Sequence, residues 1–282
     1  MIEHRPGLNL LAHLVLMLGV VIVALPVWVA FVASTHNATA FMSGTIPMWP
    51  GPNLVENYSR MLDRGLSTSG TPPVGTMMLN SLIMAMLIAV GKIAISLTSA
   101  FAIVYFRFPF RMFAFWCIFI TLMLPVEVRI VPTFQVVADL GMLNSYAGLS
   151  IPLIASATAT FLFRQVFLTI PDELTEAARI DGAGPLKFFR DILIPLSRTN
   201  IAALFVILFI YGWNQYLWPL LITTSSDYYT IVAGIKRMAD AVDGLPQWHL
   251  VMATAMLAMI PPVAVVVGMQ RLFVKGLVET EK

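Results

Sequence analysis

The sequence has 282 residues, of which 59% are hydrophobic and 11% are charged, and its formal net charge is +2 at pH 7. Soluble domains carry about 25% charged residues, so this composition excludes a water-soluble globular protein and favours one embedded in a lipid bilayer. The net charge is too small to favour binding to nucleic acid. The single cysteine, Cys117, excludes an internal disulfide and is interpreted as a small hydrophobic residue.

Six long stretches with few or no charged residues are predicted to cross the membrane as helices: residues 8–33, 77–106, 112–138, 140–163, 199–226 and 244–270. The first extends over roughly 39 Å as a helix, against a hydrocarbon core of about 30 Å. It is longer than the apolar run of a cleaved signal peptide, so we interpret it as an uncleaved span. The predicted fold class is therefore all-α, a polytopic membrane protein with six transmembrane helices. We expect residues 1–282 to form a single permease-like domain.

The distribution of Lys and Arg predicts the orientation of these spans. One side of the membrane carries eleven of these residues and the other carries five, with Lys92 set aside because it lies inside a span. Positive residues concentrate on the cytoplasmic side, so both termini are predicted to be cytoplasmic. Residues 34–76, rich in Pro, Gly, Ser and Asn, then form an external loop, as do residues 227–243. Residues 169–198 form a cytoplasmic loop.

The cytoplasmic loop contains a water-soluble passage, PDELTEAARIDGAGPLKFFRDILIPL, at residues 171–196. Pro171 suits the first turn of a helix, Gly182 can end that helix in the left-handed conformation, and Pro185 can open a second one. The first helix presents a narrow side of mostly small residues: Leu174, Ala177, Ala178 and Asp181. The pattern predicts a helix-turn-helix, which is either an amphipathic hairpin on the membrane surface or an element that docks on a partner.

The spacing within this passage resembles the EAA loop of the permeases of ABC importers. Glu176-Ala177-Ala178 is followed after three residues by Gly182, and after nine more by Ile192-Leu193-Ile194-Pro195. Ile194 stands where leucine is usual. The resemblance covers the whole chain and extends to the stretches FRFPFR, LMLPVEVRIVP and IYGWNQYLWPLL. It is strongest for the type I, MetI-like permeases of carbohydrate and glycerol-3-phosphate importers.

The resemblance implies a function and a set of partners. It implies a permease subunit that moves sn-glycerol 3-phosphate, with glycerophosphodiesters as further candidates, across the bacterial inner membrane. The expected partners are a second permease, a dimer of ATPase subunits that binds ATP and Mg, and a periplasmic substrate-binding protein. The residues expected to couple to the ATPase are Glu176, Ala177, Ala178, Asp181, Gly182 and Pro195. A sugar or polyol importer, and from another class an ion-coupled secondary transporter, remain open alternatives.

No enzyme or cofactor site is predicted on this chain. Gly91-Lys92 imitates a phosphate-binding loop, but Met86 stands where that motif needs glycine and Ile93 where it needs Ser or Thr. The four histidines are scattered and have no metal-ligand spacing. We therefore expect a subunit without catalytic residues, whose energy comes from ATP hydrolysis on a separate chain.

Polar residues within the predicted spans are the candidates for a substrate path. Charged side chains at membrane depth are costly and usually face a cavity or a partner, which applies to Lys92, Glu127 and Arg129. Lys92 is also open to simple neutralisation by a neighbouring span. Asn214 and Gln215 follow Trp213 among other aromatic residues, a combination that suits either a path for polar solutes or an aromatic belt at the membrane interface.

Overall fold

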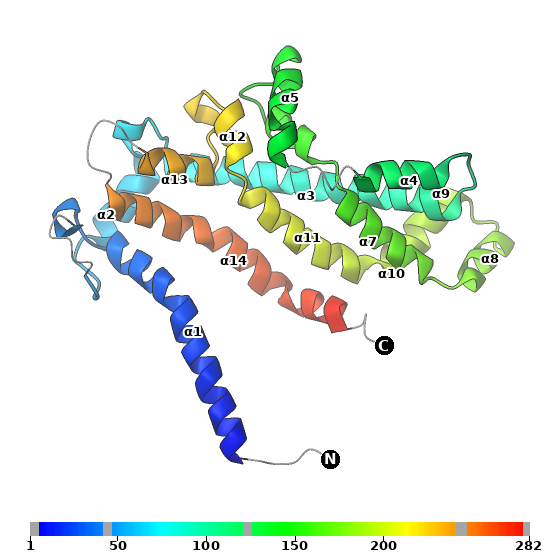
Figure 1. Cartoon of the computed structure of the whole chain (residues 1–282), viewed down its shortest axis with the longest axis horizontal. Coiled ribbons are helices and arrows are strands. Elements are labelled where there is room, and N and C mark those ends of the chain that lie inside the picture. Colours follow the sequence, from blue (N-terminus) through cyan, green and yellow to red (C-terminus); the bar gives the residue numbers. More distant parts are fainter. Residues whose placement is uncertain (1–5, 42–46, 121–125, 241–246, 279–282) are drawn as a thin grey trace. The chain divides into compact units, whose positions relative to one another are not determined.

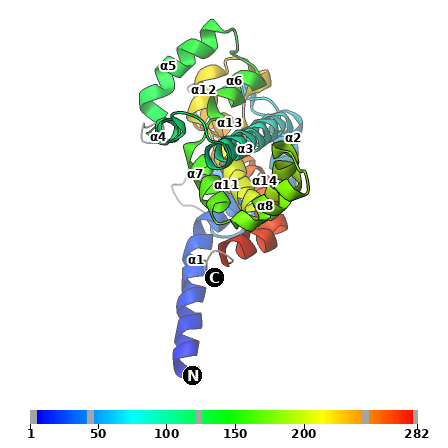
Figure 2. The same cartoon turned by 90° about the vertical axis from the view of Figure 1, so that its right-hand side faces the viewer.

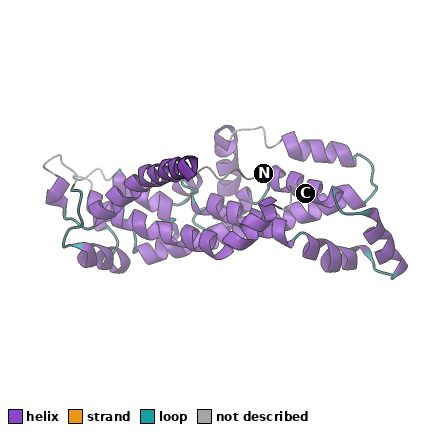
Figure 3. Cartoon of the chain, turned by 90° about the horizontal axis from the view of Figure 1, so that it is seen from below, coloured by secondary structure: helices purple, strands orange, loops and turns teal. Residues whose placement is uncertain are grey.

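The computed structural model describes the backbone of residues 6–41, 47–120, 126–240 and 247–278. These described parts are helices joined by turns, with one isolated antiparallel bridge between Leu66 and Thr71 and no strand (Figure 3). The prediction of an all-α fold is therefore confirmed. The chain divides into two compact units, one of Met1–Gly75 with Gly234–Met259 and one of Thr76–Ala233 with Ile260–Lys282. A single permease domain stays a prediction.

The α-helices are numbered as in Figure 1. They are α1 (Pro6–Ser34), α2 (Leu54–Asp63), α3 (Val74–Tyr105), α4 (Arg111–Ile120), α5 (Val126–Asp139), α6 (Tyr146–Ser150), α7 (Ala157–Leu168), α8 (Asp172–Ile180), α9 (Pro185–Phe188), α10 (Ile194–Leu196), α11 (Arg198–Trp213), α12 (Leu217–Ile222), α13 (Ile231–Ala239) and α14 (Trp248–Val278). Four short 3₁₀ helices are η1 (Ala38–Phe41), η2 (Ser67–Ser69), η3 (Ile151–Leu153) and η5 (Ser226–Tyr228), and η4 (Phe189–Leu193) is a π-helix.

Three unbroken helices in the described parts are long and apolar enough to cross a membrane: Leu10–Ser34 of α1, α3 itself, and Trp248–Gln270 of α14. Two bent pairs raise the number to five if each is one span. They are Tyr146–Leu153 with Ala157–Leu168, bent by 51°, and Pro185–Leu196 with Arg198–Trp213, bent by 73°. The predicted third span falls on α4 and α5, and residues 121–125 between these helices lie outside the described residues. At roughly 1.5 Å per residue, α4 alone reaches about half the hydrocarbon thickness.

Two predicted spans have different bounds in the structure. The helix expected from residue 140 begins only at Tyr146, because Gly141 and Asn144 have left-handed φ values of 67° and 52° and form a turn. The span predicted over residues 199–226 is two helices, α11 and α12, separated at residues 214–216. Pro219 explains this break, since its ring would clash with the carbonyl of Gln215 in one continuous helix.

The predicted external segment begins with a folded structure in the first unit. The side-chain amide of Asn57, on α2, donates hydrogen bonds to the carbonyl oxygens of Ser34 at 2.8 Å and His36 at 2.7 Å. The hydroxyls of Ser34 and Tyr58 are 2.9 Å apart. These contacts satisfy carbonyl groups at the end of α1, which otherwise lack helical partners. The segment after α1 is thus held against α2 by hydrogen bonds.

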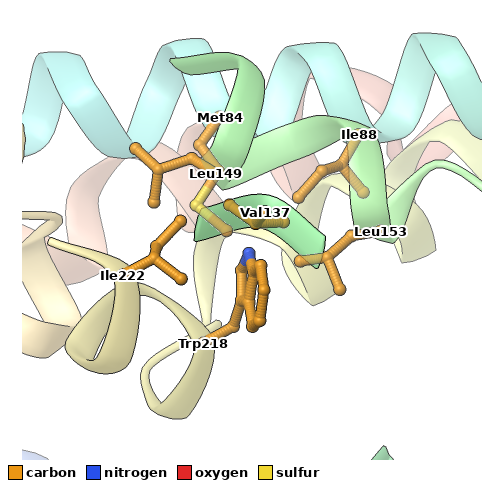
Figure 4. Close-up of a cluster of buried hydrophobic side chains, with 7 residues drawn as sticks. All are labelled: Met84, Ile88, Val137, Leu149, Leu153, Trp218 and Ile222. Carbon is orange, nitrogen blue, oxygen red and sulfur yellow. The ribbon is translucent and has the colours of Figure 1, made fainter. Parts of the chain in front are cut away.

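The core of the second unit forms where α3 meets short helices from later in the chain. A tryptophan on α12 packs among side chains from α3, α5, α6 and η3 (Figure 4). The buried members are Met84, Ile88, Val137, Leu149, Leu153, Trp218 and Ile222. The indole N–H of Trp218 donates to the carbonyl of Gly148 at 3.0 Å, so the buried polar atom is satisfied.

The helices α3 and α11 of the second unit approach closely at two small residues. A methyl group added to Gly212 would lie 2.9 Å from the Cα atom of Ala85. Small residues permit this backbone contact, as is common between helices in membranes. The contact fixes α11 along the middle of α3.

The two ends of α3 contact segments that were predicted to lie near opposite sides of the membrane. Near its start, Asn80 donates to the carbonyls of Asp227 and Tyr229 and accepts from the hydroxyl of Tyr146. At its other end, the hydroxyl of Tyr105 donates to the carbonyl of Phe167 at 3.3 Å. Within the second unit, α8 lies at this second end, which faces the viewer in Figure 2, and α12 lies away from it (Figure 1).

Candidate coupling loop and intramembrane cations

The predicted turn after α8 is present and centres on Gly182, whose φ of 69° is left-handed. The N–H of Ala183 donates to the carbonyl of Ala178 at 2.8 Å, and the N–H of Gly182 donates to that of Arg179 at 3.0 Å. These two bonds form a Schellman motif, which satisfies carbonyls at the helix end. Pro185 is the first residue of α9, as predicted. Pro171 differs slightly from the prediction, since it caps α8 instead of lying in its first turn.

The second half of the loop is anchored on the end of α3 by aromatic contacts. The ring of Phe188 lies 5.3 Å from that of Tyr105, and the ring of Phe189 lies 4.8 Å from that of Phe101. Phe188 is buried, as is Leu193 in η4. The π-helix η4 ends two residues before Pro195, which has no N–H for the carbonyl of residue 191. The packed rings therefore connect α9 and η4 to the end of α3.

The first half of the loop is mostly exposed. Of its predicted narrow side only Ala178 is buried, whereas Leu174, Ala177 and Asp181 are exposed, as are Glu176 and Pro195. Two large apolar side chains flank the Gly182 turn, Ile180 with 86% of its surface exposed and Leu186 with 79%. The loop therefore presents several acidic residues, Glu176 and Asp181 among them, and two apolar side chains around the Gly182 turn.

The cation group consists of the two cations predicted for the substrate path, Lys92 and Arg129, and the first of these contacts a tyrosine. Lys92 on α3 is buried, with 7% exposure, and its Nζ lies 4.1 Å from the centre of the Tyr211 ring on α11. Arg129 lies on α5 and is exposed. Among the described residues no carboxylate forms an ion pair with Lys92 or Arg129. The side chain of Glu127 lies outside the described residues.

Two polar residues that were predicted for the substrate path follow α11, and one of them bonds to Tyr211. Gln215 donates its side-chain amide to the carbonyl of Tyr211 at 3.3 Å, and Asn214 is the exposed C-cap of α11. Trp213 is buried and its ring is stacked on Phe209 at 6.0 Å, so it packs the helix core, while its place on a substrate path stays a prediction. The sequence indicated Tyr211 only as one of the aromatic residues around Asn214 and Gln215, and its contact with Lys92 was not predicted.

Comparison with known proteins identifies the family. Residues 92–279, two thirds of the chain, match the family described as binding-protein-dependent transport system inner membrane component. The chain belongs to this family. The permease is 62% identical over 282 residues, the whole of both chains, to the sn-glycerol-3-phosphate transport system permease protein UgpE of Brucella melitensis. Proteins of the same name from Rhizobium meliloti and Salmonella typhi are 60% and 59% identical, again over the full length of both chains.

Solved structures confirm the fold of the permease. A chain of a bacterial ABC transporter involved in import of the acidic polysaccharide alginate matches with a TM-score of 0.81 and 20% identity, covering 97% of the permease and 99% of that chain. A second alginate ABC transporter structure, in complex with a periplasmic protein, has a TM-score of 0.62 and 13% identity, with coverage of 95% and 94%. The resemblance to ABC-importer permeases is therefore confirmed, and the permease is an inner membrane component with several apolar helices.

The family match extends over every candidate residue of the permease. It begins at Lys92 and includes both the coupling loop and the group of Arg129, Tyr211 and Gln215. The individual roles of these residues stay predictions. What the structure adds is their arrangement: the loop lies at one end of α3, Lys92 lies within α3, and Arg129 lies on α5.

Proposed function

We propose that the permease is the membrane subunit of an ATP-binding-cassette importer for sn-glycerol 3-phosphate, with glycerophosphodiesters as further substrates. The observation that carries this proposal is the 62% identity over the whole chain to a permease protein of an sn-glycerol-3-phosphate transport system. Transport by alternating access would expose the solute path to one side of the membrane at a time. The candidate path consists of Lys92, Glu127, Arg129, Asn214, Gln215 and Trp213, with Tyr211 added from the structure.

The charge of the cation group supports a phosphorylated solute over a neutral one. A phosphate anion in a low-dielectric path is strongly disfavoured unless cations or hydrogen-bond donors replace its water. Lys92 and Arg129 supply two cations that have no carboxylate partner among the described residues. A sugar or polyol would gain little from such a pair, so this alternative is weaker.

The energy source and the partners are part of the proposal. ATP and Mg would bind to a dimer of ATPase subunits on separate chains, and the permease itself would hold no cofactor and carry out no catalysis. A second permease subunit and a periplasmic substrate-binding protein would complete the importer. The exposed Ile180 and Leu186 beside the Gly182 turn support docking of the loop on an ATPase subunit, because such a surface is otherwise left in water.

Purification of the intact complex tests the assembly. An affinity tag at the C-terminus of the permease should recover a second permease and an ATPase chain with a phosphate-binding loop, at two ATPase copies for each pair of permeases. Recovery of the permease alone, still able to transport, would support an ion-coupled secondary transporter instead. Washing with detergent at high salt separates stable subunits from chance contaminants.

The orientation is proposed from the positive-inside count, with both termini and residues 169–198 in the cytoplasm and residues 34–76 and 227–243 outside. Single cysteines at Ser67 and Gly184, both exposed, test it in a Cys117→Ala background. The cysteine at position 67 should react with a membrane-impermeant thiol reagent in intact spheroplasts, and that at position 184 only after the membrane is opened. Reaction of both from the same side would overturn the orientation.

A further inference from the structure

A polar cavity of about 460 Å³ lies between the end of α3 and the coupling helix α8, within the second unit. Three arginines line it, and each comes from a different segment: Arg107 from the turn after α3, Arg111 from the start of α4, and Arg179 from the last turn of α8. Asp172 and Glu176 also line the cavity. The cavity thus joins the coupling helix to the turn that follows a membrane span.

The charged groups that line this cavity are not joined in ion pairs. Among the described residues, none of the three arginines and neither carboxylate forms an ion pair. Arg111 donates one hydrogen bond, at 3.4 Å, to the carbonyl of Phe106. Three arginines against two carboxylates leave one net positive charge. Guanidinium groups bind phosphate oxygens in pairs, so the cavity suits a phosphate-bearing ligand with a single negative charge.

Exposed aromatic rings alternate with two of these arginines. Phe106, Phe108 and Phe110 are 41%, 39% and 81% exposed. Phe110 has a φ of 61°, a left-handed conformation that is rare for a bulky residue and costly for it. This backbone directs the chain into α4 while the ring stays outside the protein core. Because α3 is long and apolar enough to cross a membrane and ends at Tyr105, we expect the rings and the cavity to lie where a span meets the headgroup region.

We propose that this cavity binds the phosphodiester headgroup of an anionic phospholipid from the cytoplasmic leaflet, with Arg107, Arg111 and Arg179 as its ligands. The proposal goes beyond the transport function, because it assigns a lipid site next to the coupling loop. A phosphodiester carries one negative charge, which matches the cavity, whereas free phosphate carries between one and two near neutral pH. Basic cavities at the cytoplasmic ends of membrane helices are suited to such headgroups. A bound lipid would bridge α8 to the end of α3.

The test measures lipid retention by native mass spectrometry of the purified complex. Dioleoylphosphatidylglycerol is titrated against dioleoylphosphatidylcholine, whose phosphodiester is neutralised by its own cation. We expect saturable retention of phosphatidylglycerol by the wild-type complex. Arg179→Gln should weaken it roughly fivefold, and Arg107→Gln with Arg111→Gln by the product of two such factors. Arg179→Gln is the safer variant for folding, since its side chain is exposed on α8.

Arg190→Gln provides the matched control. Arg190 is exposed on the same loop and pairs with Asp191 at 2.8 Å, outside the cavity, so its removal should leave lipid retention at the wild-type level. Equal retention in the Arg179 variant and the wild type would overturn the proposal. Displacement of the lipid by millimolar inorganic phosphate would overturn the lipid proposal and indicate a site for free phosphate. Loss of the ATPase chain with lipid retention unchanged would assign these arginines to a protein contact.

Discussion

The substitution Gly182→Val is expected to uncouple the permease from ATP hydrolysis. Uptake of the substrate should fall by about tenfold or more. Gly182 has a φ of 69°, which a β-branched residue resists at a cost of at least about 1–2 kcal/mol. The turn would rearrange, and with it the two hydrogen bonds that end α8 and the position of Ile180 beside the docking surface. Substrate-stimulated ATP hydrolysis and uptake by the reconstituted complex measure the effect, while insertion into the membrane should not change.

Gly184→Val is the matched control for this prediction. An added Cβ would meet no atom within 4 Å at either glycine, so the two sites differ in backbone conformation and not in available space. Gly184 has φ −68° and ψ 166°, an extended conformation that valine adopts readily. The Gly184 variant should therefore keep most of its coupled ATP hydrolysis. Equal loss of coupled ATP hydrolysis in both variants would indicate that the loss comes from an altered loop surface and not from a strained turn.

Arg129→Gln is expected to reduce uptake of a phosphorylated substrate sharply, by about tenfold or more, with assembly and basal ATP hydrolysis largely intact. Its guanidinium stays charged at physiological pH and can bind two phosphate oxygens, and such a charged hydrogen bond contributes roughly 1.5–3 kcal/mol. Glutamine keeps hydrogen-bonding capacity but removes the positive charge that would bind the phosphate. Uptake of labelled substrate into proteoliposomes gives the measurement.

Lys236→Gln controls for the loss of one positive charge. Lys236 is about half exposed and pairs with Asp240 at 2.9 Å on α13, and exposed ion pairs of this kind contribute little. Uptake of the phosphorylated substrate by the Lys236→Gln variant should stay near that of the wild type. If the Arg129 variant fails to assemble, Arg129 has a structural ion pair with a partner. Unchanged uptake would remove Arg129 from the solute path.

The features that were predictable from the sequence are those encoded locally. The bounds of α3, predicted as 77–106 and observed as Val74–Tyr105, follow from an apolar stretch that no proline interrupts. The turn at Gly182 and the helix start at Pro185 were predictable because each depends on the conformational preference of one residue. The coupling loop could therefore be located, and its turn described, without a structure.

The features that were not predictable depend on bends and on contacts between distant segments. Counting charges over residues 199–226 did not reveal the break before Pro219, because the segment is apolar on both sides of it. The contact of Tyr211 with Lys92 was not predicted because it depends on how α11 packs on α3. The arginine-lined cavity likewise brings Arg107 and Arg179 together only in the folded chain.

Uptake by a fully reconstituted importer tests the central claim most directly. The permease, its second permease, the ATPase dimer and the substrate-binding protein are placed in proteoliposomes, and labelled sn-glycerol 3-phosphate is offered on the side of the binding protein. The account predicts accumulation that requires ATP on the opposite side, is absent when the permease is omitted, and is not matched by glycerol or a neutral sugar. Accumulation driven by a proton or sodium gradient without ATP, or equal uptake of a neutral sugar, would contradict it.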